Sequence, residues 1–253
     1  MISPAFAVAL IFVSFSYSGW NAAAYIGGEI KDPGRSLPRA LILGTTIVII
    51  LYLGLNYVFI NTVSFNDLAG KVEVGSLAAQ AIFGDKGGTF MGLAISLILV
   101  SSVSAMIMTG PRVYQALGED FSFYRILAVK TKRNAPLAAI LLQMSIAILL
   151  IVTTTFEWLL YFIGFTLSII TFLTVLGIYI HRYQYPNVKR PYRTLGYPVT
   201  PAIYLLLSIW MVVHTIIEKP VVSLAGFGTL FVGLLIYYLT IGKVTIRKLL
   251  NKK

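Results

Sequence analysis

The sequence predicts an all-α, polytopic bundle of transmembrane helices. Hydrophobic residues make up 58% of the 253-residue chain, charged residues make up only 11%, and the mean hydropathy is +0.85. Soluble globular domains carry about 25% charged residues, so this composition excludes a water-soluble enzyme. The charges also gather in short segments between long apolar runs, a pattern typical of membrane proteins with several spans.

Seven apolar segments are candidates for crossing the bilayer, which takes roughly 20 residues of helix. Because lipid offers no hydrogen-bond partner to the backbone, we expect each of them to be helical. The segments are residues 4–29, 37–63, 88–108, 136–152, 158–180, 199–217 and 221–240. Residues 75–83 are too short to cross and are expected to form a helix at the membrane interface.

The distribution of basic residues predicts the orientation of these spans. The segments that follow the first, third, fifth and seventh spans hold 17 of the 20 Lys and Arg residues. By the positive-inside rule these segments are cytoplasmic, which places the amino terminus outside and the carboxyl terminus in the cytoplasm. The net charge of +11 is therefore interpreted as a topology signal, and no nucleic-acid partner is expected. The expected location is the plasma membrane, with the lipid bilayer as partner.

An outside amino terminus combined with an odd number of spans is typical of the rear part of a longer membrane protein. Truncation is therefore a hypothesis for this chain, with earlier spans also odd in number.

The first segment is the most unusual because polar and small residues interrupt it near mid-depth. They are Ser14, Ser16, Ser18, Gly19 and Asn21. One interpretation is a discontinuous helix that opens around Gly19, with the hydroxyls and the carboxamide satisfying the freed backbone groups beside a wet cavity. The other is a continuous helix whose small face packs against a neighbour. Composition alone leaves both open.

A broken helix would suit a zwitterionic substrate. The first half ends in carbonyls with partial negative charge and the second begins with amides of partial positive charge, so one break offers a cation site and an anion site. None of the nine acidic residues lies at the centre of a span. The spans therefore contain no carboxylate relay for protons, and a substrate would be held by backbone and neutral side chains.

Two strings at a specific spacing point to a known family. Residues 15–21 (FSYSGWN) and 29–40 (EIKDPGRSLPRA) resemble the sixth helix and the following cytoplasmic loop of amino acid permeases of the amino acid, polyamine and organocation superfamily. Residues 110–120 (GPRVYQALGED) resemble the end of the eighth helix, and residues 134–136 (NAP) the entry to the ninth. The resemblance implies that residues 1–253 are the carboxyl-terminal part of a permease, spans six to twelve of a partial LeuT-like fold, comprising the second repeat and two extra helices.

The resemblance also implies a function and a site. The function is secondary active transport of amino acids by alternating access. Carbonyls near Phe15, Ser16 and Ser18 would receive the substrate ammonium, Phe15 would gate from outside, and Gly19 would allow the bend. Asn21 would be a nearby polar contact. No second glycine-rich break occurs in the chain, so the facing helix would come from missing amino-terminal helices.

Other interpretations stay open. A standalone seven-span structural or accessory protein, or a nonfunctional remnant, would use the serines of the first span only for packing. Ser101, Ser102 and Ser104 could coordinate sodium, although packing is the commoner role of such serines.

Three further sequence features bear on packing and chemistry. Tyr161, Phe162 and Phe165 could wall a side-chain pocket or belong to an aromatic belt. Gly88 and Gly92 are expected to mark a close helix contact. No Walker loop, His-Glu-x-x-His motif or Ser/His/Asp set occurs, so no enzymatic activity, cofactor or metal is expected.

Overall fold

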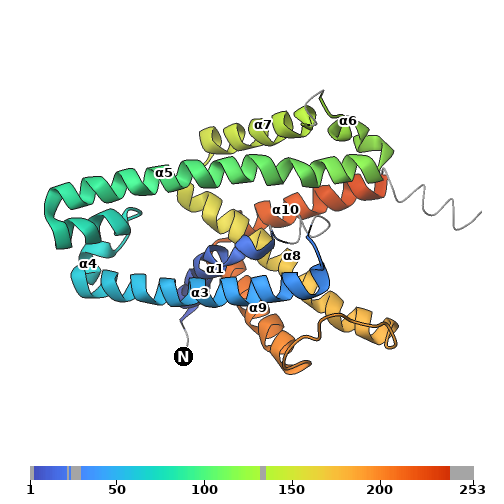
Figure 1. Cartoon of the computed structure of the whole chain (residues 1–253), viewed down its shortest axis with the longest axis horizontal. Coiled ribbons are helices and arrows are strands. Elements are labelled where there is room, and N and C mark those ends of the chain that lie inside the picture. Colours follow the sequence, from blue (N-terminus) through green and yellow to red (C-terminus); the bar gives the residue numbers. More distant parts are fainter. Residues whose placement is uncertain (1–2, 22, 24–29, 132–134, 240–253) are drawn as a thin grey trace, which may run out of the picture. The chain divides into compact units, whose positions relative to one another are not determined.

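In the computed structural model, which describes residues 3–21, 23, 30–131 and 135–239, all regular elements of the described residues are helices (Figure 1). The chain divides into two compact units, residues 1–21 with 115–253, and residues 22–114. The prediction of an all-α fold is confirmed.

The first unit is a bundle built around α1, α8, α9 and α10. Its elements are α1 (Pro4–Ser16), η1 (Ser18–Trp20), the end of α5, η3 (Ser122–Tyr124), α6 (Arg125–Ala128), α7 (Leu137–Thr153), α8 (Phe156–Gln184), α9 (Val199–Glu218) and α10 (Pro220–Tyr237). α1 packs against both α8 and α9, and α10 packs against the same two helices. α7 contacts α6.

Close approach of backbones organises the core of this bundle. A Cβ atom added to Gly164 of α8 would lie 2.3 Å from Cγ2 of Ile11, a fully buried residue of α1. A Cβ atom added to Gly226 of α10 would lie 2.7 Å from Cδ1 of Phe165, whose ring also meets Phe227 edge to face at 5.3 Å. Glycine at these two positions therefore lets α8 contact both neighbours at short range.

The second unit contains α3 (Pro33–Thr62), α4 (Phe65–Leu68) and most of α5 (Val74–Asp120). α5 is two helices joined by a turn at Gly84, whose φ of 73° and ψ of −171° are not helical. The predicted helix over residues 75–83 is thus present. It folds back on the next turns of α5, because a Cβ on Gly88 would lie 3.0 Å from Cβ of Gln80 and one on Gly92 would lie 3.6 Å from Oγ of Ser76. The expected close contact at Gly88 and Gly92 is confirmed.

Helix boundaries differ from the sequence prediction at two prolines. α3 begins at Pro33 and contains Pro38, although the sequence predicts a start at residue 37. α5 continues through Pro111 to Asp120, well beyond the predicted end at residue 108. Membrane helices tolerate an internal proline because neighbouring groups satisfy the freed backbone carbonyl.

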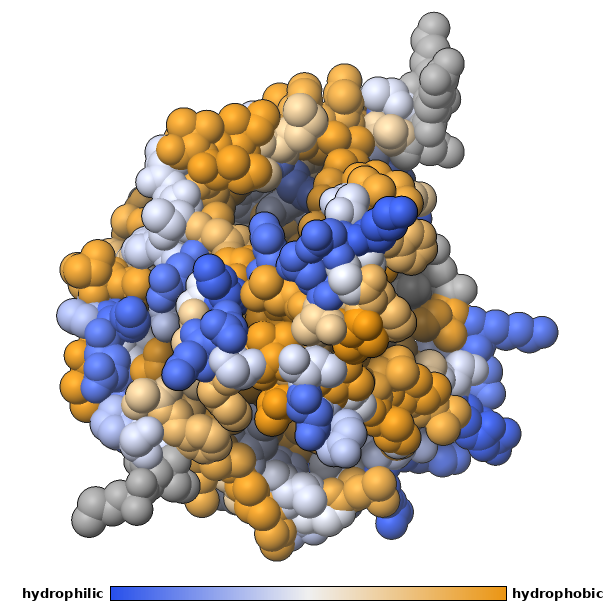
Figure 2. Space-filling model, turned by 90° about the vertical axis from the view of Figure 1, so that its left-hand side faces the viewer, coloured by the Kyte–Doolittle hydropathy of each residue, from blue (hydrophilic) through white to orange (hydrophobic). Residues whose placement is uncertain are grey.

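In the part of the chain that the structure describes, five helices are long and apolar enough to cross a membrane: α3, α5, α8, α9 and α10. Residues 4–20 and α7 are apolar but shorter than 18 residues. α3 buries none of its residues, and large apolar side chains such as Leu53 (66% exposed) point outward. Figure 2 shows apolar side chains over much of the face drawn. A surface of this kind requires lipid or other apolar helices around it, so the chain is an integral, multi-pass membrane protein.

Candidate functional site: the interrupted helix α1

The first apolar segment changes helix type within the stretch where the sequence leaves a broken and a continuous helix open. α1 starts with Ser3, whose Oγ accepts a hydrogen bond from the amide of Phe6 at 3.3 Å, and with Pro4 in the first turn. It ends at Ser16 after 13 residues. Tyr17 leaves the α-helical conformation (φ −98°, ψ 5°), and residues 18–20 form a 3₁₀ turn. Most of the predicted second half, residues 22–28, lies outside the described residues.

Serine hydroxyls bond to backbone carbonyls around the interruption. Ser16 Oγ donates to the carbonyl of Phe12 at 2.9 Å, and Ser18 Oγ donates to the carbonyl of Phe15 at 2.7 Å. The amide of Tyr17 donates to the carbonyl of Ser14 at 3.3 Å. The serines thus stabilise the end of the helix and leave it partly electronegative.

Asn21 follows the 3₁₀ turn and has an unsatisfied polar atom. Its Oδ1 is enclosed, and among the described residues no donor reaches it. Leaving a buried acceptor unsatisfied costs about 1–3 kcal/mol, which a ligand N–H group would recover. Near the break, the side chain of Asn21 is therefore the candidate acceptor for a hydrogen-bond donor of a ligand.

Gly19 lies in the middle of the 3₁₀ turn, with open space where a side chain would be. A Cβ atom added there would have no heavy atom within 4 Å, and the φ of Gly19 is outside the left-handed region. The change in helix type falls at Tyr17, two residues earlier. In this conformation neither backbone strain nor packing requires glycine at position 19.

Neighbouring helices hold α1 just before the break. The ring of Phe12 lies 4.5 Å from the ring of Tyr161 on α8, measured between centroids. Ser14 Oγ lies 3.8 Å from Sδ of Met211 on α9. Of the three aromatic residues that the sequence suggests for a pocket wall, Tyr161 therefore lies beside α1, whereas Phe165 belongs to the core. Met211 carries no sequence signal beyond an apolar helix position.

Two of the serines considered for a sodium site bond within their own helix. Ser102 Oγ and Ser104 Oγ donate to carbonyls of their own helix, those of Ile98 at 3.1 Å and Val100 at 2.9 Å. These bonds fit the packing interpretation better than a sodium site. Among the described residues, no group of three or more His, Asp or Glu side chains could hold a metal ion.

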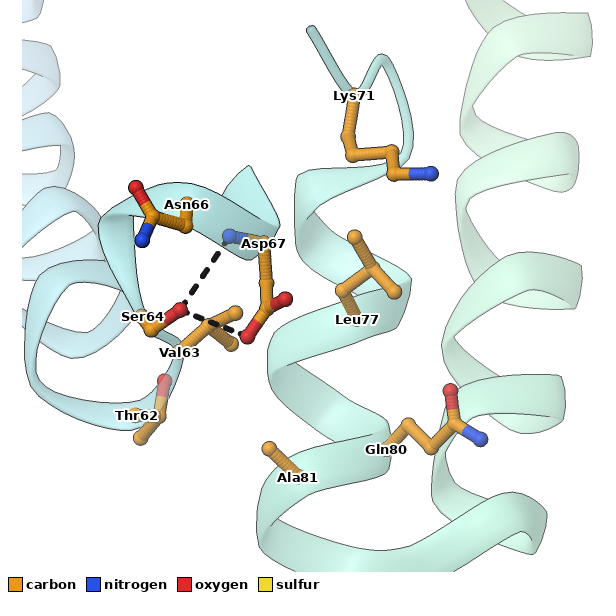
Figure 3. Close-up of a pocket in the computed structure, with 9 residues that line it drawn as sticks. All are labelled: Thr62, Val63, Ser64, Asn66, Asp67, Lys71, Leu77, Gln80 and Ala81. Atoms are coloured by element: carbon orange, nitrogen blue, oxygen red, sulfur yellow. Dashed lines mark hydrogen bonds between the residues drawn. The ribbon is translucent and has the colours of Figure 1, made fainter. Parts of the chain in front are cut away.

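A cavity of about 490 Å³ lies in the second unit, where α3 ends and α5 begins (Figure 3). Ser64 Oγ donates to Asp67 Oδ2 at 2.7 Å and accepts from the amide of Asp67 at 3.3 Å. Lys71 and Gln80 also line the cavity. Sequence analysis missed it, although Ser64 three residues before an acid is a capping signal. The cavity offers a carboxylate and an ammonium on an exposed rim.

Comparison with known proteins assigns the chain to a family. The family model described as "Amino acid permease" matches residues 2–242. The chain belongs to the amino acid permease family. The predicted resemblance is thereby confirmed, and the proteins that this permease resembles are transporters rather than enzymes.

Several curated transporters are similar to this permease. It is 28% identical over 236 residues to the mouse (Mus musculus) large neutral amino acids transporter small subunit 2, covering 92% of this chain and 44% of the relative. It is 27% identical over 237 residues to the serine/threonine exchanger SteT of Bacillus subtilis, covering 92% of this chain and 54% of that protein. The human (Homo sapiens) b(0,+)-type amino acid transporter 1 is 26% identical over 243 residues, with 92% and 48% covered. The chain thus spans about half the length of these relatives.

Proposed function

We propose that this permease takes part in secondary active transport of amino acids, and that α1 with its 3₁₀ turn forms half of the substrate site. The observation that carries the proposal is the end of α1 at Ser16, inside an apolar segment of a membrane protein. Irregular backbone at membrane depth is tolerated where it is buried in protein or lines a water-filled cavity.

The substrate is an amino acid bound as a zwitterion. Its ammonium group is received by carbonyls near Phe15, Ser16 and Ser18, where the α-helix ends with partial negative charge. Asn21 Oδ1, which has no donor among the described residues, accepts from the same ammonium group. The open space beside Gly19 leaves room for the ligand. Phe15, partly buried at the last turn of α1, closes the site from the outer side.

The mechanism is alternating access. The substrate carboxylate is held by a second helix break that faces α1, contributed by the part of the permease that corresponds to the unmatched length of its relatives. Movement of the helix bundle then exposes the site to one side of the membrane and afterwards to the other. The amino terminus of residues 1–253 is outside and the carboxyl terminus is cytoplasmic, in agreement with the basic segments. The membrane is the plasma membrane.

A substitution that fills the space beside the break tests this proposal. Gly19→Leu in the permease that carries this chain is expected to abolish uptake of radiolabelled amino acids, while its abundance at the membrane stays unchanged. Gly177→Leu on α8 is the matched control, because a Cβ there also has no heavy atom within 4 Å. Undiminished uptake by Gly19→Leu would refute the site, and equal loss in both variants would show that the effect is unspecific.

A further inference from the structure

A second site is suggested by an apolar cavity between α8 and α9. Its volume is about 630 Å³, and it lies where the two helices are joined by residues 185–198 (Figure 1). Leu176 and Tyr179 of α8 line it together with Ala202, Ile203 and Leu206 of α9. The hydroxyl of Tyr179 donates to the carbonyl of Pro198, another lining residue, so this polar atom is already engaged. The cavity suits a hydrocarbon chain and offers little to a polar solute.

A cationic group is connected to the lining of this cavity through two aromatic rings. The guanidinium carbon of Arg182 lies 3.7 Å from the centre of the Tyr197 ring. That ring in turn lies 5.3 Å from the ring of Tyr179, which lines the cavity. A stacked guanidinium keeps its N–H groups in the plane of the fork, where they remain available to an anion. Arg182 is thus placed for an anionic group at the end of an apolar chain.

The segment that contains this cavity carries basic residues and no acidic ones. The sequence between Glu157 and Glu218 contains no acidic residue. It contains four basic residues, all at the end of α8 and in the loop that follows: Arg182, Lys189, Arg190 and Arg193. The Arg190 guanidinium donates to the carbonyls of Tyr185 at 2.7 Å and Val188 at 3.1 Å, which fixes the loop. The ion pair found among the described residues, Lys130 with Glu119, involves none of the four.

We propose that this cavity binds a phospholipid with an anionic headgroup. One acyl chain fills the cavity between α8 and α9, and the headgroup phosphate bonds to Arg182, with Lys189 and Arg193 adding attraction. Tyrosines and basic residues together are typical of the level of lipid headgroups, and basic pockets between membrane helices recognise anionic lipids. The site shares no residue with the proposed substrate site on α1.

Lipid binding to the delipidated full-length chain in detergent tests the proposal. The probes are phosphatidylglycerol and phosphatidylcholine with identical acyl chains, and the bound lipid is counted by native mass spectrometry. Each basic residue near the membrane surface contributes about 1 kcal/mol, so phosphatidylglycerol is expected to bind at least about fivefold more tightly. Glycerol 3-phosphate, which has the phosphate but no acyl chain, is expected not to displace it. Equal binding of the two lipids, or displacement by glycerol 3-phosphate, would overturn the proposal.

Two sets of variants test the headgroup contact and the acyl-chain contact separately. Arg182→Gln is expected to remove most of the preference for phosphatidylglycerol, Arg182→Lys to retain part of it, and Arg125→Gln on α6 to leave it unchanged. Ala202→Trp fills the cavity and is expected to abolish the binding of both lipids at this site. Leu224→Trp, at a position 74% exposed on α10, is the control of equal bulk. The proposal fails if Arg182→Gln behaves like Arg125→Gln, or if Ala202→Trp binds phosphatidylglycerol as the parent does.

Discussion

Gly164 of α8 and Ile11 of α1 touch so closely that no side chain fits between them: an added Cβ would lie 2.3 Å from Cγ2 of Ile11. Ile11 is fully buried, so it has no free direction in which to move. The contact fixes the helix that carries the break against the longest helix of its unit.

Gly164→Ala is therefore expected to destabilise the bundle by about 1–3 kcal/mol, the usual cost of overpacking. Gly177→Ala on the same helix is the control, because its Cβ would meet no atom within 4 Å. The measurement is the thermal unfolding midpoint of the chain in detergent. Equal midpoints for the two variants would contradict the close contact of α1 with α8.

The turn at Gly84 brings Ser76 close to Gly92, so an engineered disulfide between these positions tests the turn. The chain has no cysteine, and a Cβ on Gly92 would lie 3.6 Å from Oγ of Ser76. Ser76→Cys with Gly92→Cys is expected to form an intrachain disulfide under mild oxidation, seen as a mobility shift that reductant reverses. Adding Gly84→Ala should lower the cross-linking yield, because a φ of 73° is strained for a residue with a side chain. A yield that Gly84→Ala leaves unchanged would show that the turn does not depend on glycine.

Asn21→Ala separates binding from folding. Oδ1 of Asn21 is enclosed and has no donor within the described part of the chain, so its removal is expected to leave stability unchanged or to raise it. The KM for amino acid uptake is expected to rise about tenfold or more, which corresponds to the loss of a hydrogen bond to a charged group. Asn61→Ala is the control, since its Nδ2 donates to the Tyr57 carbonyl of its own helix at 2.7 Å. If uptake by Asn21→Ala keeps the parent KM, Asn21 does not contact the substrate.

Cysteine labelling tests the orientation. Val72 (75% exposed) lies in a segment predicted to be outside, and Lys189 in one predicted to be cytoplasmic. In intact cells, Val72→Cys should react with a membrane-impermeant maleimide, and Lys189→Cys should react only after permeabilisation. The opposite pattern would overturn the topology and move the proposed lipid site to the outer leaflet.

Sequence reasoning predicts what depends on local chemistry. Three serines, a glycine and an asparagine in an apolar run mark residues 14–21 as a candidate interruption, but composition leaves a broken and a continuous helix equally open. The short helix before Gly84 and the glycine face that receives it also follow from local pattern. The family follows from two strings of residues at a fixed spacing.

What the sequence misses depends on contacts between distant segments. The close contact at Gly164 exists only because α1 crosses α8 at that position. In the sequence, Gly164 cannot be distinguished from any other glycine of a membrane helix. The cavity between α8 and α9 forms largely from aliphatic side chains, such as Leu176, Ile203 and Leu206, that individually predict only lipid exposure. Pro111 predicts the end of a helix, yet α5 continues, because the cost of a proline depends on its neighbours.

The restraint on Ile11 has a consequence for how the proposed site opens and closes. α1 is held by three contacts. Ile11 packs against Gly164, the ring of Phe12 lies against the ring of Tyr161, and Ser14 contacts Met211. Tyr17 is where the backbone leaves the α-helical conformation. We expect any rearrangement that accompanies transport to use Tyr17 as a hinge, while α1 keeps its position against α8 and α9.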